Sequence, residues 1–323
     1  MTLSIESLNL VKEAVKHKAQ DLYLLPSKSY YRICYKYNNE FKFLRKMPKN
    51  DAQLIINQLK YVAKLDIAEH RRPQNGSFNL DDYPDTGFRI ATLSDYESQE
   101  SMVVRIIYSE NTQRYFFPEQ LNQLKNLATK RGLIVFSGPV GSGKTTTMYE
   151  IAKSLIPEKM VMTIEDPVEI KNSDFFQVQV NEQVQMSYED LLKAALRHRP
   201  DVLIVGEIRD SKTAQVAIEA ALSGHLVLAT IHAKSTYGII ERFKQLGVET
   251  SQLQNTLNCI CYQRLLPNIK YQLACLIDIL VPQKKYDYQK SQYQNYYLWQ
   301  NHLQNIYDLG YIDEKTFITY QEG

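Results

Sequence analysis

Short apolar runs alternate with helix-spaced segments in the second half of the chain. The runs lie at Leu133–Phe136, Met160–Ile164, Val202–Val205 and Leu226–Ala229. A continuous apolar run is typical of a parallel strand that is buried on both faces, and helices connect such strands. The pattern therefore predicts an α/β fold in which helices flank a parallel sheet.

The first 107 residues follow a different pattern. Helical spacing is found at Leu8–Lys18 and at Asp51–Leu65, where Asp51 is suited to be the N-cap. Strand-like runs occur at Asp21–Pro26, Tyr30–Tyr35, Phe88–Leu93 and Ser101–Ile107. We expect residues 1–107 to form a separate, smaller α+β domain.

A polar and aromatic segment separates these two patterns. Residues 108–117 end just before Pro118 and are predicted to be a linker. Residues 118–323 then form the second domain. From about Ser251 onward we expect this domain to be mostly helical, and a Tyr- and Gln-rich segment around Tyr286–Tyr297 is predicted to be poorly buried.

A glycine-rich loop follows the first apolar run of the second domain. It fits the pattern G-x-x-x-x-G-K-[ST] of a phosphate-binding loop, between a predicted strand and a predicted helix. Lys144 is expected to contact the β- and γ-phosphates of ATP, and the Thr145 hydroxyl is expected to bind Mg²⁺. The predicted nucleotide-binding residues are Gly138, Pro139, Val140, Gly141, Ser142, Gly143, Lys144, Thr145 and Thr146. With this loop, the α/β domain is predicted to be a RecA-like P-loop core.

Two carboxylates lie at the ends of predicted strands. Glu165 belongs to Ile164–Glu169, and Glu207 ends an apolar run in the manner of a Walker B element that holds the Mg²⁺ shell. Glu165 is placed to orient or deprotonate the attacking water. The alternatives are a solvated acidic turn for Glu165 and an ion pair with Arg209 for Glu207.

Two histidines bracket the last apolar run. His225 precedes Leu226–Ala229 and His232 follows it. A single histidine at the end of a strand is more often structural than catalytic, so spacing alone leaves both possibilities open.

Composition restricts the class of protein further. The chain has 323 residues, 44% hydrophobic content and a net charge of +2, so bulk charge does not indicate nucleic acid or an anionic membrane as a direct ligand. The four cysteines form no CxxC pair, which is typical of a reducing compartment and argues against structural zinc. No signal peptide and no apolar run of about 18 residues is found, so a cytoplasmic location is expected.

Taken in order, the motifs resemble those of the secretion-ATPase superfamily. The phosphate-binding loop is followed by Ile164–Glu169, Gly206–Asp210 and Gly224–His232. Members of this superfamily drive type II secretion, type IV pilus assembly and retraction, and assembly of the competence pseudopilus. Asp21–Pro26, Arg72–Gly76 and Gln263–Leu265 are also similar to superfamily segments, and Arg197–Asp201 resembles the ComGA-type competence ATPases of Gram-positive bacteria.

The resemblance implies a role for each candidate residue. Glu165 would be the general base and Glu207 the Walker B glutamate. His225 and His232 would sense the γ-phosphate or couple subunits. The N-terminal domain would be PAS-like, and its strand arginines, Arg89 and Arg105, would close over the nucleotide; the alternative is that they are ordinary surface arginines.

The chain departs from the commoner superfamily pattern at Arg197–Asp201, where it resembles the competence branch, and also at Asn75, Ser77 and Val140. Asn75 and Ser77 stand where members have aspartate and arginine, which weakens any role for this turn at the site. Val140 stands where they usually have threonine, which the loop tolerates because its backbone binds the phosphate.

The resemblance also implies a machine and its partners. We expect a hexameric ring, attached peripherally to the inner face of the cell membrane, that powers assembly of a competence pseudopilus or type IV pilus for DNA uptake. It would act on a polytopic membrane platform protein and indirectly on pilin-like subunits, without binding nucleic acid directly. The alternatives are a pilus-retraction ATPase, a RecA-type DNA translocase and a scaffold that does not hydrolyse ATP.

Overall fold

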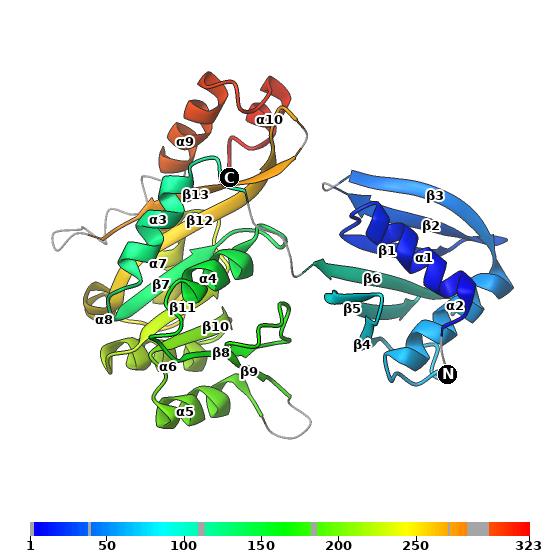
Figure 1. Cartoon of the computed structure of the whole chain (residues 1–323), viewed down its shortest axis with the longest axis horizontal. Coiled ribbons are helices and arrows are strands. Elements are labelled where there is room, and N and C mark those ends of the chain that lie inside the picture. The colour runs from blue at the N-terminus through cyan, green and yellow to red at the C-terminus, as the bar shows by residue number, and fades with distance from the viewer. Residues whose placement is uncertain (1–2, 38–39, 109–113, 182–185, 271, 283–296) are drawn as a thin grey trace. The chain divides into compact units, whose positions relative to one another are not determined.

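The chain forms two compact units, Met1–Asn111 and Thr112–Gly323 (Figure 1). The computed structural model describes residues 3–37, 40–108, 114–181, 186–270, 272–282 and 297–323. The division falls within the predicted linker 108–117, of which residues 109–113 lie outside the described residues. Residues 114–117 pack with the second unit, since the Phe116 N–H donates to the Cys275 carbonyl at 3.0 Å.

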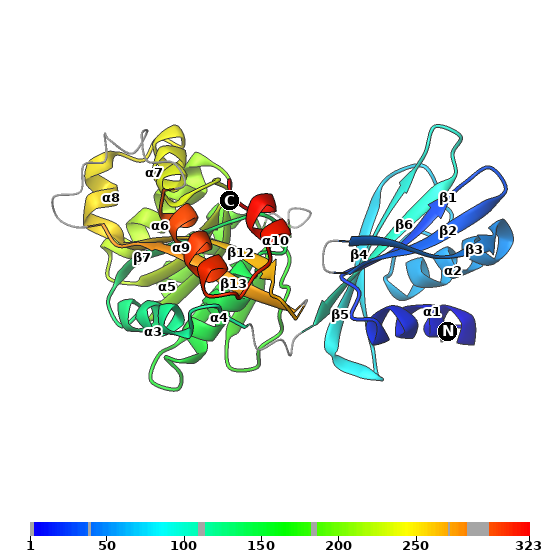
Figure 2. The same ribbon diagram turned by 90° about the horizontal axis from the view of Figure 1, so that it is seen from above.

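The first unit is a six-stranded antiparallel sheet with two helices on one face (Figure 2). The strand order is β3-β2-β1-β6-β5-β4. Its elements are α1 (Ile5–Lys16), β1 (Asp21–Pro26), β2 (Tyr30–Tyr37), β3 (Glu40–Pro48), α2 (Lys49–Val62), β4 (Gln74–Leu80), β5 (Tyr83–Ser94) and β6 (Glu100–Tyr108). Apolar residues of both helices and alternate strand residues such as Leu22, Leu24 and Val104 form its core. This is the small α+β unit that the sequence predicts.

Two details of the first unit differ from the prediction. Helix α2 begins at Lys49 after Pro48, so the assignment of Asp51 as N-cap is wrong, and Asp51 lies in the first turn. Strands β3 and β4 were not predicted from the sequence. Both are edge strands, and polar residues interrupt the apolar positions of each, so neither has the continuous apolar run of a buried strand.

The second unit is built on a seven-stranded sheet of order β13-β12-β7-β11-β10-β8-β9. All neighbouring pairs are parallel except β12 and β13. Its strands are β7 (Gly132–Ser137), β8 (Val161–Glu165), β9 (Phe176–Gln179), β10 (Val202–Ile208), β11 (Leu226–Ile231), β12 (Leu257–Pro267) and β13 (Leu273–Leu280). Its helices are α3 (Pro118–Leu127), α4 (Lys144–Lys153), α5 (Tyr188–His198), α6 (Ser211–Leu222), α7 (Thr236–Gln245), α8 (Thr250–Thr256), α9 (Tyr297–Asp308) and α10 (Glu314–Thr319). The four strands predicted from apolar runs form the centre of this sheet, and the α/β prediction is confirmed.

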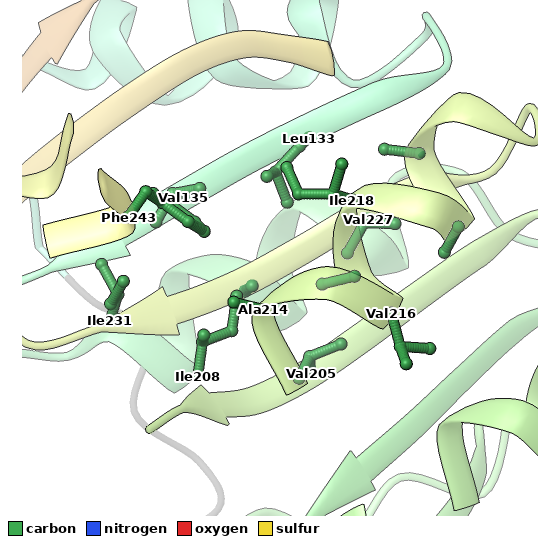
Figure 3. Packing of buried hydrophobic residues seen from close by; sticks show 14 of the residues in the cluster. Leu133, Val135, Val205, Ile208, Ala214, Val216, Ile218, Val227, Ile231 and Phe243 are labelled. Atoms are coloured by element: carbon green, nitrogen blue, oxygen red, sulfur yellow. The ribbon is translucent and has the colours of Figure 1, made fainter. Parts of the chain in front are cut away.

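Helices cover both faces of this sheet, which explains the continuous apolar runs. Every residue of β7 and β11 is buried. Leu133 and Val135 pack with α6 and α7 on one face, as Figure 3 shows. Ile134 and Phe136 alternate with them and pack with α3 and α4 on the other face.

The part of the chain after Ser251 is not mostly helical. Leu257–Leu280 contains the hairpin of β12 and β13, so the prediction of a mostly helical C-terminal part is wrong there. Helices α9 and α10 follow, and Trp299 of α9 is fully buried against Tyr262 of β12. Of the Tyr- and Gln-rich segment, residues 286–296 lie outside the described residues.

Candidate nucleotide-binding and catalytic site

Four predicted features of the second unit lie at the ends of four neighbouring parallel strands or directly after them. Parallel strands all end at the same edge of a sheet, and ligands of open α/β sheets bind outside that edge. The phosphate-binding loop follows β7, Glu165 ends β8, Glu207 lies near the end of β10 and His232 follows β11. The structure therefore brings these four features to one edge.

Glycines with left-handed backbone conformation shape the loop. Gly138, Gly141 and Gly143 have φ values of 146°, 78° and 82°. Residues other than glycine rarely adopt these backbone angles. A Cβ at Gly138 would lie only 2.2 Å from the Gln263 carbonyl oxygen. Helix α4 begins directly after Gly143 without a side-chain N-cap hydrogen bond. An uncapped helix N-terminus offers N–H groups and positive potential to an anion.

Lys144 places a cation inside the loop. Its Nζ donates to the carbonyl oxygens of Gly138 and Pro139 at 2.8 and 2.9 Å. Burial lowers the pKa of Lys144, and the negative charges of Glu207 and Glu169 partly oppose that shift. These carbonyl partners are neutral, so they do not cancel the positive charge of the Lys144 ammonium group. That charge can therefore pair with a phosphate.

Glu207 lies between His232 and Arg209. Its Oε1 is 2.7 Å from His232 Nε2, and its Oε2 accepts from Arg209 Nε at 2.7 Å. The Gly206–Glu207 pair lies opposite Thr230 alone, where the β10–β11 register shifts, and such a bulge redirects a side chain at a site. The ion pair with Arg209 is thus present, and His232 joins it. Arg209 also approaches Asp166, with 3.5 Å between Nη1 and Oδ2.

Glu165 is a buried carboxyl group. Only 3% of it is exposed, and its Oε1 accepts a 2.5 Å hydrogen bond from the Tyr149 hydroxyl of α4. Burial raises the pKa of Glu165, whereas the Tyr149 hydrogen bond lowers it. A solvated acidic turn is therefore excluded for this residue. A carboxyl with a raised pKa at a ligand edge fits a general base.

Replacing Tyr149 with phenylalanine tests this assignment. The change removes the hydrogen bond that favours the ionised form, so the pKa of Glu165 should rise further. A base works only when ionised, so the acidic limb of the pH–rate profile for ATP hydrolysis should move to higher pH. The measurement is the hydrolysis rate across pH 5–9. Tyr115→Phe is the control, because the Tyr115 hydroxyl donates to Glu150. Superimposable profiles for Tyr149→Phe and the wild type would count against Glu165 as the base.

Glu169 joins the site, although the sequence analysis assigned it no role. Its Oε2 lies 3.4 Å from the Thr145 hydroxyl. Oxygen donors of this kind are the ligands that Mg²⁺ prefers, usually in company with substrate phosphates and waters. Among the described residues, no group of three or more His, Cys, Asp or Glu side chains is arranged to hold a metal ion. The Thr145 hydroxyl and the Glu169 carboxylate are oxygen donors that fit a nucleotide-bound Mg²⁺.

His225 lies at the other edge of the sheet. It precedes β11, and its Nδ1 is 3.0 Å from the Ala220 carbonyl oxygen. The six residues of β11 span about 20 Å at about 3.3 Å per residue. Within one chain, the structure does not bring His225 together with His232 and the phosphate-binding loop.

Arg89 and Arg105 lie side by side in the first unit. They are register partners on β5 and β6, and Arg105 is also the register partner of Asp21 on β1. Arg105 Nε donates to Asp21 Oδ1 at 2.9 Å. Their neighbours Phe88 and Val104 belong to the core beneath the helices, so the arginines lie on the opposite, open face of the sheet.

Comparison with known proteins places the chain among secretion ATPases and their relatives. Residues 3–297 match the family described as type II/IV secretion system protein. The chain is 41% identical over 258 residues to competence protein ComGA of Streptococcus pneumoniae, covering 80% of this chain and 82% of that protein. It is 36% identical over 277 residues to ComGA of Bacillus subtilis, covering 83% and 76%.

A solved structure has a similar fold over most of this chain. The crystal structure of the pilus retraction motor PilT with bound ADP superposes with a TM-score of 0.74 at 26% identity. The comparison covers 97% of this chain and 96% of that one.

Proposed function

Because the chain belongs to the type II/IV secretion system protein family, we propose that it is an ATP-hydrolysing motor that powers assembly of a competence pseudopilus for DNA uptake. The observation that carries the proposal is the single edge of the sheet at which Lys144, Glu165 and Glu207 lie, at or just after the ends of parallel strands. The ComGA relatives match across most of this chain and of their own length. The same edge supports an ATPase of a secretion or pilus machinery.

Residues of the second unit would bind and activate the nucleotide. The loop Gly138–Thr146 surrounds the phosphates with backbone N–H groups, and Lys144 exchanges its carbonyl partners for phosphate oxygens. The Thr145 hydroxyl and the Glu207 carboxylate would hold Mg²⁺, which would neutralise charge on the phosphates when bound. Glu165 accepts the proton of the attacking water.

Residues of the first unit would complete the site when the motor closes. Arg89 and Arg105 form a pair of guanidinium groups on an open sheet face. Guanidinium groups that reach a transferring phosphoryl group stabilise its transition-state charge. Closure on ATP and release after hydrolysis would then turn chemistry into displacement of one unit against the other.

The ring and its partners belong to the same proposal. Subunits would form a hexameric ring, in which His232 reports the nucleotide state through Glu207, and His225 keeps only the role of coupling subunits. The ring would act in the cytoplasm at the inner face of the membrane, on a polytopic platform protein and indirectly on pilin-like subunits. None of the helices in the described ranges is long and apolar enough to cross a membrane.

A retraction motor is the second candidate. It is favoured by the likeness to PilT, a pilus retraction motor. The identity to PilT is 26%, against 41% to the competence protein of S. pneumoniae, so assembly is the better supported function.

The test is a strain whose only copy carries Glu207→Gln. We expect it to lose both surface pseudopili and DNA uptake, because the Mg²⁺ shell loses its carboxylate while the fold is kept. Glu219→Gln, which changes an exposed glutamate of α6, is the matched control and should behave as wild type. Pili that assemble but do not retract would favour the retraction motor, and normal uptake would exclude the competence role.

A further inference from the structure

Gln263 of β12 contacts the phosphate-binding loop from the neighbouring strand. Tyr262 is the register partner of Ser137, the last residue of β7. The next residue of β12, Gln263, therefore lies alongside the start of the loop. The Gly138 backbone packs so closely on the Gln263 carbonyl that no Cβ fits there.

The Gln263 side chain is fully buried and bonded to the loop. No part of it is exposed, and its Nε2 donates a 2.8 Å hydrogen bond to the Ser142 carbonyl oxygen. A buried acceptor that loses its donor is costly, so this bond constrains the loop strongly.

This bond sets the orientation of one peptide group. The Ser142 carbonyl and the Gly143 N–H belong to the same planar trans peptide, in which C=O and N–H point in opposite directions. Holding the carbonyl toward β12 points the Gly143 N–H away from β12. Gly143 is the residue immediately before α4 and has φ 82°, so its conformational freedom would otherwise allow the peptide to turn over.

We infer that Gln263 is a positioning residue for nucleotide binding: it keeps the Ser142–Gly143 peptide turned so that the Gly143 N–H faces the phosphates. The inference rests on the proposed nucleotide site and assigns no contact between Gln263 and the nucleotide. Its effect is on nucleotide affinity, through the loop.

A second buried glutamine provides a matched control. Gln120 of α3 lies in the same unit, and its Nε2 donates to the Ile277 carbonyl oxygen of β13 at 2.7 Å. Both glutamines leave their Oε1 without a hydrogen-bond partner among the described residues. The two side chains thus make the same kind of bond, and only Gln263 makes it to the loop.

The experiment compares Gln263→Met with Gln120→Met in the full chain. Methionine fills a similar volume and cannot donate. We expect both variants to lower the melting temperature, but only Gln263→Met to weaken ADP binding, by about ten-fold in Kd, measured by calorimetry. Equal ADP affinity for the two variants would overturn the inference.

A third variant tests the hydrogen bond itself. Glutamate at position 263 cannot donate when ionised but can donate when protonated. ADP affinity of Gln263→Glu, relative to that of the wild type, should therefore recover as the pH is lowered, whereas that of Gln263→Met should not. Parallel pH profiles for the two variants would contradict the assignment.

Other results would show that the proposed nucleotide site, and not the role of Gln263, is wrong. If wild-type protein does not bind ADP, or if Lys144→Ala binds it as tightly as wild type, the proposed function fails. If both behave as proposed and Gln263→Met retains full affinity, only the inference about Gln263 fails.

Discussion

Lys144→Ala should lower the rate of ATP hydrolysis by about 10²–10³-fold. The ammonium group lies within the loop and is bonded to the Gly138 and Pro139 carbonyls, ready to compensate charge on the β- and γ-phosphates. Alanine leaves that charge unbalanced in a partly buried site, where electrostatic interactions are stronger than in water. The measurement is phosphate release by purified protein at saturating Mg–ATP.

Lys153→Ala is the control for this change. Lys153 is the last residue of the same helix and is exposed, so its removal alters net charge equally without touching the loop. We expect it to hydrolyse ATP at the wild-type rate. Unchanged hydrolysis by Lys144→Ala would show that the loop is not the catalytic phosphate site.

Arg89→Ala and Arg105→Ala should each lower hydrolysis by about 10³-fold or more, the range known for arginines that reach a transferring phosphoryl group. The loss should appear in kcat, because the proposed function has the arginines contact the nucleotide only when the first unit closes. Single-turnover hydrolysis of bound ATP measures this step directly. Arg32→Ala provides the control, because Arg32 is an exposed arginine on β2 of the same sheet.

The ion pair of Arg105 requires a further control. Its removal leaves the buried Asp21 carboxylate without that partner, so Arg105→Ala should also be less stable. Arg105→Lys can keep a charge beside Asp21 but loses the planar pair of donors. A lysine variant that is stable and still slow separates catalysis from stability. Full activity in both alanine variants would contradict a catalytic role and show that the arginines are ordinary surface residues.

The sequence predicts the centre of the second unit because burial there is complete. Strands β7 and β11 are buried at every residue, so their composition alone marks them. Strand β12 was missed since Gln263 and Arg264 interrupt its apolar run. Gln263 is nevertheless fully buried, and its burial depends on a partner 121 positions away, which no local pattern shows.

The same limit applies to the site. Strand direction predicts that Glu165, Glu207 and His232 share an edge, and the structure brings them there. Strand direction also indicates that His225, which precedes its strand, lies at the far edge, whereas the motif alone does not distinguish it from His232. The Tyr149–Glu165 contact joins α4 to β8, so it follows from packing and not from spacing.

We propose that guanidinium groups of the first unit close over a nucleotide held at the edge of the second unit's sheet. The most direct test is a structure of the assembled protein with Mg²⁺ and a non-hydrolysable ATP analogue. We predict that, in at least one subunit, a guanidinium nitrogen of Arg89 or Arg105 lies about 2.7–2.9 Å from a phosphate oxygen. Both arginines far from the phosphates in every subunit, whether open or closed, would contradict the account.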